Sequence, residues 1–307
     1  MTNYRSNEYW KSSTNYRPFE LRSHRFRDDM LPVFYKWLDI HGNSIILDAG
    51  CGSGVFTRFL AKGLTTGHIT GFDISDAFIE YGNEKIIELC LNKNVNLEIA
   101  DGYNLHYPDN HFDAVTNYTY IGVLADMKAG LEELIRVCKK SGTVSCVVAT
   151  NNIPNIGYQG NYPFEGAMRL QQLATLEWKI HCGNAIQGPM TQLAELELMV
   201  ECGLKDIHIY PFAHLMCYND TNLPSEYRKT LAMDETADEI RWLKSRYSEK
   251  EKSYTEQGFS SKDFAELVAL LERKLDYLTH HFDSDNSYEW HGGFNFIVTG
   301  QKYSNPT

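Results

Sequence analysis

The sequence lacks any cluster of lysine and arginine, and its 29 basic residues are outnumbered by 40 acidic ones, giving a formal net charge of −11. Proteins that bind nucleic acids neutralise phosphates with clustered basic side chains. The charge balance therefore argues against a DNA or RNA partner.

Long apolar runs are also missing. No stretch approaches the roughly 20 apolar residues that a membrane-spanning helix needs, and the first residues, MTNYRSNEYW, contain no apolar core of signal-peptide length. We therefore expect a cytoplasmic protein without a membrane span. We also expect a monomer or a homodimer.

Paired cysteines are absent as well. The seven cysteines are scattered and none forms a C-x-x-C pair, which predicts reduced, buried thiols. His280 and His281 are adjacent, and neighbouring residues on a helix point about 100° apart, whereas chelating pairs prefer a spacing of four. The sequence therefore predicts no metal site.

From residue 43 to 150, short β-branched runs alternate with helical patterns, which is typical of parallel βαβ units. Further helices are expected over residues 26–40, 164–181 and 191–203 and after Ser260, and the helix before Cys138 is expected to end in Lys139 and Lys140. The predicted strands are residues 45–49, 69–73, 95–99, 113–117, 143–149, 206–212 and 293–302. These elements predict an α/β fold with a doubly wound sheet.

Three alternate glycines stand in Ile45–Gly54, directly after a predicted buried strand and before a helix that begins near Phe56. Glycine allows a sharp backbone turn and a close approach to a ligand. A dinucleotide fingerprint requires a small residue where Val55 stands, and the Gly-Lys-Ser/Thr of a P-loop is absent. Both phosphate-binding interpretations are therefore weakened.

Acidic residues end the next two predicted strands. Asp73 stands where a carboxylate can accept hydrogen bonds from both hydroxyls of a ribose, which implies an unphosphorylated adenosine. Asp101 can accept from an adenine amine, and the adjacent Gly102 leaves room for the ring. The fourth strand runs into Asn117 and Tyr118.

In this order and spacing, these features resemble the class I S-adenosylmethionine-dependent methyltransferases, especially the small-molecule branch that includes quinone-biosynthesis enzymes. The resemblance covers roughly residues 40–150. It implies a seven-stranded, mostly parallel sheet with an antiparallel last strand, and S-adenosylhomocysteine as the product. The cofactor-binding residues that it implies are Asp48, Gly50, Gly52, Gly54, Asp73, Ile74, Asp101, Gly102, Asn117 and Tyr118.

Within this resemblance, the three glycines shape the loop around the methionine moiety and Asp48 hydrogen-bonds near its amino group. Asn117 and Tyr118 flank the methionine end. The chain departs from the family pattern after the fourth strand, where Tyr120–Leu124 stands, and this segment bears on the substrate pocket.

The predicted organisation has six parts. They are an N-terminal aromatic arm and helix (1–42), a Rossmann-like core that binds S-adenosylmethionine (43–150), an insertion (151–190), a core helix and strand (191–212), a helical lid (213–291), and a last strand with a tail (292–307). The connection of about eighty residues is too long for an ordinary hairpin, which is why we expect a lid over the methyl donor.

Methyl transfer from a sulfonium is an in-line displacement, so the enzyme must chiefly position the acceptor and exclude water. If a general base is needed, His214, expected just after the sixth strand, and His291, expected just before the seventh, are candidates. A structural imidazole is the alternative for each. Aromatic candidates for the substrate site, which suit a cation or a flat acceptor, are Tyr9, Trp10, Tyr16, Tyr118 and Trp290.

The sequence thus predicts a methyltransferase with a small-molecule acceptor, whose reacting atom (N, O, S or C) stays open. Two alternatives are kept. One is an NAD(P)-dependent oxidoreductase, and the other is a catalytically silent protein that binds S-adenosylmethionine.

Overall fold

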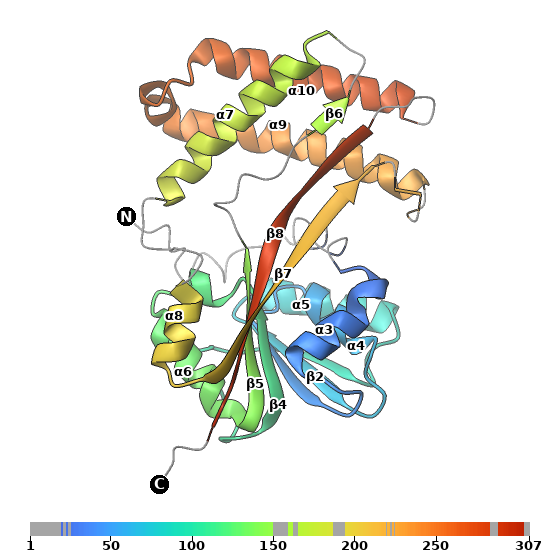
Figure 1. The fold of residues 1–307 in the computed structure, drawn as a ribbon. Helices are drawn as coiled ribbons and strands as arrows, with labels where there is room; N and C mark the ends of the chain where they lie inside the picture. Colours follow the sequence, from blue (N-terminus) through green and yellow to red (C-terminus); the bar gives the residue numbers. More distant parts are fainter. Residues whose placement is uncertain are drawn as a thin grey trace. The chain divides into compact units, whose positions relative to one another are not determined.

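The computed structural model describes residues 20, 23, 26–149, 159–161, 165–186, 194–218, 220–221, 223, 225–282 and 288–303, with the backbone alone in parts of these ranges. The chain divides into two compact units. The first comprises residues 1–150, 189–212 and 294–307, and the second comprises residues 151–188 and 213–293. Figure 1 follows the chain through both.

The first unit is built on a sheet. Its strands are β1 (Ile45–Ala49), β2 (His68–Asp73), β3 (Val95–Ile99), β4 (Phe112–Tyr118), β5 (Cys138–Ala149), β7 (Lys205–Cys217) and β8 (Tyr288–Gln301). The order is β3-β2-β1-β4-β5-β8, parallel as far as β5, with β8 antiparallel to β5 and paired with β7. The predicted doubly wound, mostly parallel sheet with an antiparallel last strand is confirmed.

Helices cover both faces of this sheet because successive strand residues point to opposite sides. In β1, Ile46 packs with residues of α3 (Leu31–Leu38), α4 (Val55–Ala61) and α5 (Asp76–Glu88). The next residue, Leu47, packs with residues of α6 (Met127–Val137) and α8 (Ala194–Glu201). Asp126 begins α6 by accepting a hydrogen bond from the Ala129 amide at 2.9 Å.

Several element boundaries differ from the prediction. The helix before Cys138 ends at Val137, and Lys139 and Lys140 lie in β5 and not in a basic last helical turn. Cys138 is already extended, with ψ 139°, and the register shifts between Phe112 and Ala114 where this segment joins the sheet. Helical periodicity alone did not reveal this early strand start.

The second unit is helical and has its own core. Its helices are α7 (Ala167–Ile186), α9 (Ser225–Glu256) and α10 (Ser261–His281), and its short strand β6 (Gln159–Asn161) pairs with the first residues of β8. A capping box of Ser260 and Asp263 begins α10. Arg169 of α7 pairs with Asp263 and Glu266 of α10, so the two insertions form one unit. Its role as a lid stays a prediction.

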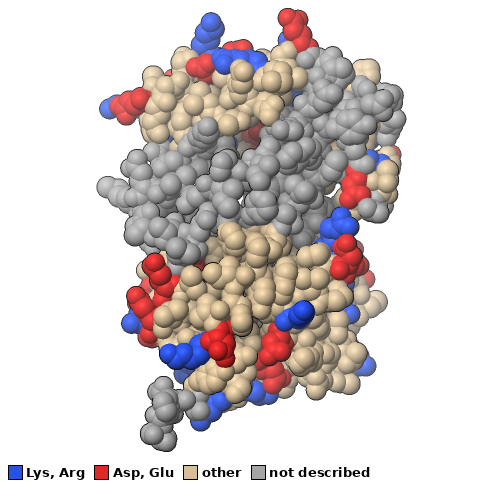
Figure 2. Space-filling view, viewed as in Figure 1, with Lys and Arg blue, Asp and Glu red and all other residues tan. Residues whose placement is uncertain are grey.

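Among the helices that the structure describes, none has the length and apolar character needed to cross a membrane. On the face shown in Figure 2, blue and red side chains of the described residues are interspersed. The exclusion of a nucleic-acid partner stays a prediction from the net charge.

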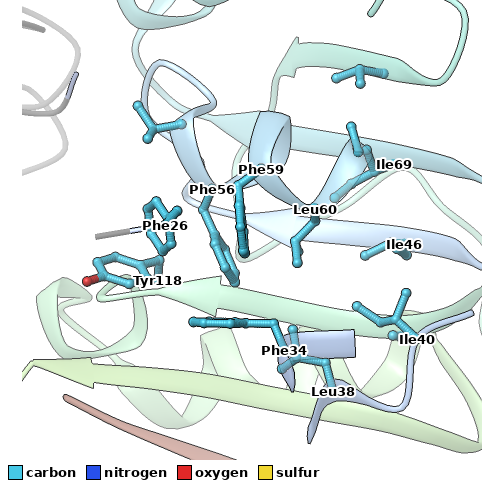
Figure 3. Close-up of a cluster of buried hydrophobic side chains, with 14 of the residues drawn as sticks. Phe26, Phe34, Leu38, Ile40, Ile46, Phe56, Phe59, Leu60, Ile69 and Tyr118 are labelled. Atoms are coloured by element: carbon cyan, nitrogen blue, oxygen red, sulfur yellow. The ribbon is translucent and has the colours of Figure 1, made fainter. Parts of the chain in front are cut away.

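An aromatic cluster on the α3 and α4 face anchors the first unit (Figure 3). Phe34 is fully buried, and its ring lies edge-on to Phe59 and Phe212, with ring centroids 5.3 Å apart in both pairs. Removing the ring leaves a cavity that rigid neighbouring elements cannot fill.

We therefore expect Phe34→Ala to lower the free energy of unfolding by about 3–5 kcal/mol, whereas Phe34→Leu, which keeps most of the volume, costs less. Urea unfolding measures both. Ile87→Ala, at a position 68% exposed, serves as the control and should change stability by about 0.5 kcal/mol or less. Equal effects at positions 34 and 87 would contradict this account of the core.

Candidate active site

The loop between β1 and α4 has a backbone that only glycine adopts readily. Gly50, Gly52 and Gly54 have φ angles of 63°, 56° and 79°, in the left-handed region that a Cβ disfavours. The Cys51 amide donates to the Phe72 carbonyl of β2 at 2.8 Å. The loop therefore runs beside the carboxyl end of β2.

Asp73, the last residue of β2, holds this loop through a hydrogen bond. Its Oδ2 accepts from the Gly52 amide at 2.9 Å, and its Oδ1 accepts from the Ser75 amide at 3.0 Å. Burial raises its pKa despite these bonds. The backbone of Ile74 also hydrogen-bonds to this carboxylate. A carboxylate has about four acceptor positions, so capacity remains for a further donor such as a ribose hydroxyl.

Asp48 lies beneath the loop and is fully buried. Its Oδ2 accepts from the Thr57 hydroxyl at 2.6 Å, whereas its Oδ1 has no partner among the described residues. Burial raises the pKa of Asp48 to about 7, and the charge of Asp73 acts in the same direction. An unpaired buried carboxylate oxygen is costly, and an ammonium group is its natural complement.

Tyr120 fills the space between the glycine loop and Gly102. A Cβ at Gly50 would lie 2.0 Å from its Cδ2, and a Cβ at Gly102 would lie 1.8 Å from its hydroxyl oxygen. The ring of Phe72 packs edge-on against it at 5.8 Å. Gly102 thus makes room for Tyr120, where the sequence suggested room for an adenine ring. The residue before Tyr120, Thr119, has a φ of 58°, a strained value for a β-branched residue.

Asn117 and Tyr118 are engaged inside the protein. The Asn117 amide group donates to the Ser145 carbonyl at 3.0 Å, and its oxygen accepts from the Tyr120 and Ile121 amides at 3.4 and 3.5 Å. Tyr118 lies in the aromatic cluster beside Phe26 and Phe56 (Figure 3). Asn117 therefore shapes the turn that positions Tyr120.

Other predicted site residues are placed as follows. Asp101 is exposed and its Oδ1 accepts from the Tyr103 amide at 3.1 Å, while Ile74 is half-buried next to Asp73. The structure thus gathers Asp48, the glycine loop, Asp73 and Gly102 at the carboxyl ends of β1 to β3. Among the residues that it describes, no group of three or more potential ligands is arranged to hold a metal ion.

The acceptor candidates are placed less completely. Tyr9, Trp10 and Tyr16 lie outside the described residues. His214 lies within β7, and Trp290 and His291 lie within β8, so the expectation that these three flank the strands was wrong. Both strands extend beyond their apolar runs, and the extension of β8 pairs with β6.

Two residues that contact the site, Thr57 and Tyr120, were not predicted from the sequence. Thr57 stands nine positions after Asp48, and nothing in the pattern indicated that its hydroxyl would hold the Asp48 carboxylate. Tyr120 lies in the segment that departs from the family pattern, which was the available signal, but its contacts with two glycines far apart in sequence come from the fold.

The contact between Tyr120 and Gly102 gives a prediction. Gly102→Ala places a methyl group 1.8 Å from the Tyr120 hydroxyl oxygen and 3.0 Å from its Cζ, so we expect a loss of about 1–3 kcal/mol in stability. Tyr120→Phe removes the nearer atom, and the double variant should recover more than half of the loss. Urea unfolding of the four proteins gives the coupling, and strictly additive effects would contradict the contact.

Comparisons with known proteins agree with this site. A family model described as a methyltransferase domain matches residues 46–142, from β1 to the start of β5. The demethylmenaquinone methyltransferase of Listeria welshimeri serovar 6b is 32% identical over 169 residues, which cover 52% of this chain and 71% of that protein. The Bacillus mycoides protein of the same name is 30% identical over 185 residues, covering 57% and 76%.

The match to the demethylmenaquinone methyltransferase of Listeria monocytogenes serotype 4a is 32% identical and shorter, so that the chain spans 51% of that relative's length. Among solved structures, phosphoethanolamine N-methyltransferase 2 of Haemonchus contortus in complex with S-adenosyl-L-methionine shares the fold. It has a TM-score of 0.51 and 15% identity, covering 98% of this chain and 61% of that one.

None of these comparisons supports the oxidoreductase alternative. The glycine loop, the carboxylates at the ends of β1 and β2, and the relatives of which this chain covers more than two thirds all lead to one family. The chain belongs to the class I methyltransferases that use S-adenosylmethionine as cofactor.

Proposed function

We propose that this protein transfers the methyl group of S-adenosylmethionine to a small aromatic acceptor of the quinol type. The observation that carries the proposal is the arrangement of Asp48 and Asp73 around the glycine loop, with an unpartnered buried oxygen on Asp48. The acceptor class comes from the named activity of the relatives, demethylmenaquinone methyltransferase.

In this proposal, Asp73 accepts hydrogen bonds from the ribose hydroxyls and Asp48 accepts one from the ammonium of the methionine moiety. The loop backbone lies close to the methionine moiety because its glycines have no side chains. Asp101 accepts from the adenine amine, Ile74 lies beside the base, and Gly102 acts on the site through Tyr120, for which it leaves room. Asn117 holds the turn after β4 at the methionine end.

Transfer then needs an electron-rich atom opposite the leaving sulfur. A quinone ring is electron-poor, so the acceptor is its reduced form, whose ionised hydroxyl increases electron density on the ring carbon. The methyl carbon would form a bond to that ring carbon as its bond to sulfur breaks, which leaves S-adenosylhomocysteine. The hydrogen on the methylated ring carbon would then leave as a proton to a base, which restores the aromatic ring. His214 and His291 remain the candidates for the base, and Tyr9, Trp10, Tyr16, Tyr118 and Trp290 remain candidates for the acceptor site.

Cofactor binding is the first test. Calorimetry should show that the protein binds S-adenosylhomocysteine and that Asp73→Ala weakens binding by at least about 30-fold, since two hydrogen bonds to a charged group are lost. Asp76→Ala removes a nearby exposed carboxylate at the start of α5 and should stay within about twofold. Absence of binding by the unmodified protein would refute the proposal.

Turnover separates an enzyme from a catalytically silent binder. Incubation with S-adenosylmethionine and a panel of reduced hydroxynaphthoquinones lacking the ring methyl should yield S-adenosylhomocysteine and a methylated product of equal amount by mass spectrometry. The oxidised acceptors serve as the control and should give none. Binding of the cofactor without product from any acceptor would favour the silent protein.

Asp48 provides a prediction about pH. Its pKa is about 7 in the folded protein and near 3.8 when unfolded, so the folded state holds more protons between these values and stability falls as pH rises toward 7. Asp48→Asn removes this titration. Relative to the parent, the variant should gain roughly 2–3 kcal/mol between pH 5 and pH 7 and about 0.4 kcal/mol more above pH 7, where the titration is completed.

Urea unfolding across this pH range, without cofactor, measures the effect. The same variant should bind S-adenosylhomocysteine at least about tenfold more weakly, because a hydrogen bond to a charged group is lost. A constant difference in stability from pH 5 to pH 8 would show that Asp48 does not titrate in this range.

A further inference from the structure

Glu20 connects the N-terminal segment to the glycine loop. Its Oε1 accepts a hydrogen bond from the Ser53 hydroxyl at 2.6 Å, and its Oε2 accepts from Nη2 of Arg58 at 2.7 Å. Arg58 in turn donates from Nη1 to the Ser53 carbonyl at 2.8 Å. Both the side chain and the backbone of Ser53 are therefore held by one ion pair, whose acidic member lies 33 positions earlier in the chain.

This ion pair is largely shielded from water. The Arg58 side chain is 9% exposed, the Glu20 side chain is 24% exposed and Ser53 is buried. Within the described ranges, Glu20 is the acidic side chain that pairs with Arg58. Removing one partner of such a pair leaves a charge in a poorly hydrated place, which strongly disfavours that state.

The loop transmits the contact to the proposed cofactor site. Ser53 stands between Gly52 and Gly54, and the Gly52 amide is the donor that Asp73 holds at 2.9 Å. Glu20 holds the Ser53 hydroxyl of this short loop, and Asp73 holds the Gly52 amide. All three glycines of the loop have positive φ, a conformation that Asp73, Glu20 and the hydrogen bond from the Cys51 amide to the Phe72 carbonyl all help to hold.

We propose that Glu20 is a positioning residue that holds the glycine loop, through Ser53, in the shape that binds the cofactor, an inference that rests on the proposed function. When Glu20 is docked, the loop holds the shape that receives the methionine moiety. Linkage then requires the converse, so that bound cofactor strengthens the contact of Glu20 with Ser53 and Arg58 by the same factor. Glu20 and the cofactor thus stabilise the same loop conformation.

A second ion pair provides a control. Asp28, also in the N-terminal segment, pairs with Lys62 at the end of α4 at 2.6 Å, with side chains 74% and 48% exposed. It joins the same segment to the same helix but does not touch the glycine loop. Because this pair is more exposed and therefore weaker, it reports the effect of losing an ion pair in this segment when the glycine loop is left untouched.

The test measures two quantities in the unmodified protein, Glu20→Ala, Glu20→Gln and Asp28→Ala. The first is the affinity for S-adenosylhomocysteine by calorimetry. The second is the rate of amide hydrogen exchange in the loop peptide that spans residues 50–58, without ligand. Glu20→Gln keeps the side-chain shape and the acceptor for Ser53, and it serves if Glu20→Ala does not fold.

We expect Glu20→Ala to weaken binding about tenfold, Glu20→Gln to weaken it less, and Asp28→Ala to change it by less than twofold. Amides of the loop should exchange about tenfold faster in Glu20→Ala than in the unmodified protein, and at the unmodified rate in Asp28→Ala. Unchanged affinity in both Glu20 variants, equal losses of affinity at positions 20 and 28, or unchanged loop exchange in Glu20→Ala would each overturn the inference. If the unmodified protein does not bind the ligand at all, the proposed function fails instead.

Discussion

The hydrogen bond from the Gly52 amide to the Asp73 carboxylate is the contact on which the site depends. It joins the loop after β1 to the end of β2, two strands that pair in parallel from Ile45 to Ala49. Because parallel strands end at the same edge, a carboxylate at the end of one lies within reach of the loop that follows the other. The shape of the proposed cofactor site therefore depends first on how β1 and β2 pair, and only then on individual side chains.

Stability and ligand binding make opposite demands on Asp48. Burial beside a second carboxylate raises its pKa, and one of its oxygens has no partner among the described residues. For stability alone, a neutral or apolar residue at position 48 would be more favourable. Retaining the carboxylate is understandable if a ligand brings a compensating positive charge, which is a common reason why active sites are locally destabilising.

The sequence could predict whatever depends on local spacing. Glycines at alternate positions after a buried strand fixed the loop, and acidic residues at strand ends identified Asp73, whose carboxylate does hold that loop. Contacts between distant segments had no such signal. Glu20 meets Ser53, and Tyr120 meets both Gly50 and Gly102, only because the folded sheet brings their segments together. The lengths of β7 and β8 were underestimated for the same reason, since pairing with other strands extends them past their apolar runs.

The position of β8 has a consequence for how the chain folds during synthesis. This strand pairs with β5, β6 and β7, so it contributes hydrogen bonds to both units. Until β8 has been synthesised, the edge of β5 that β8 later covers has unpaired backbone groups from Thr143 to Ala149. Exposed strand edges invite pairing with other chains. A nascent chain that ends before β8 would therefore expose a strand edge that can pair with other chains, although its glycine loop is complete.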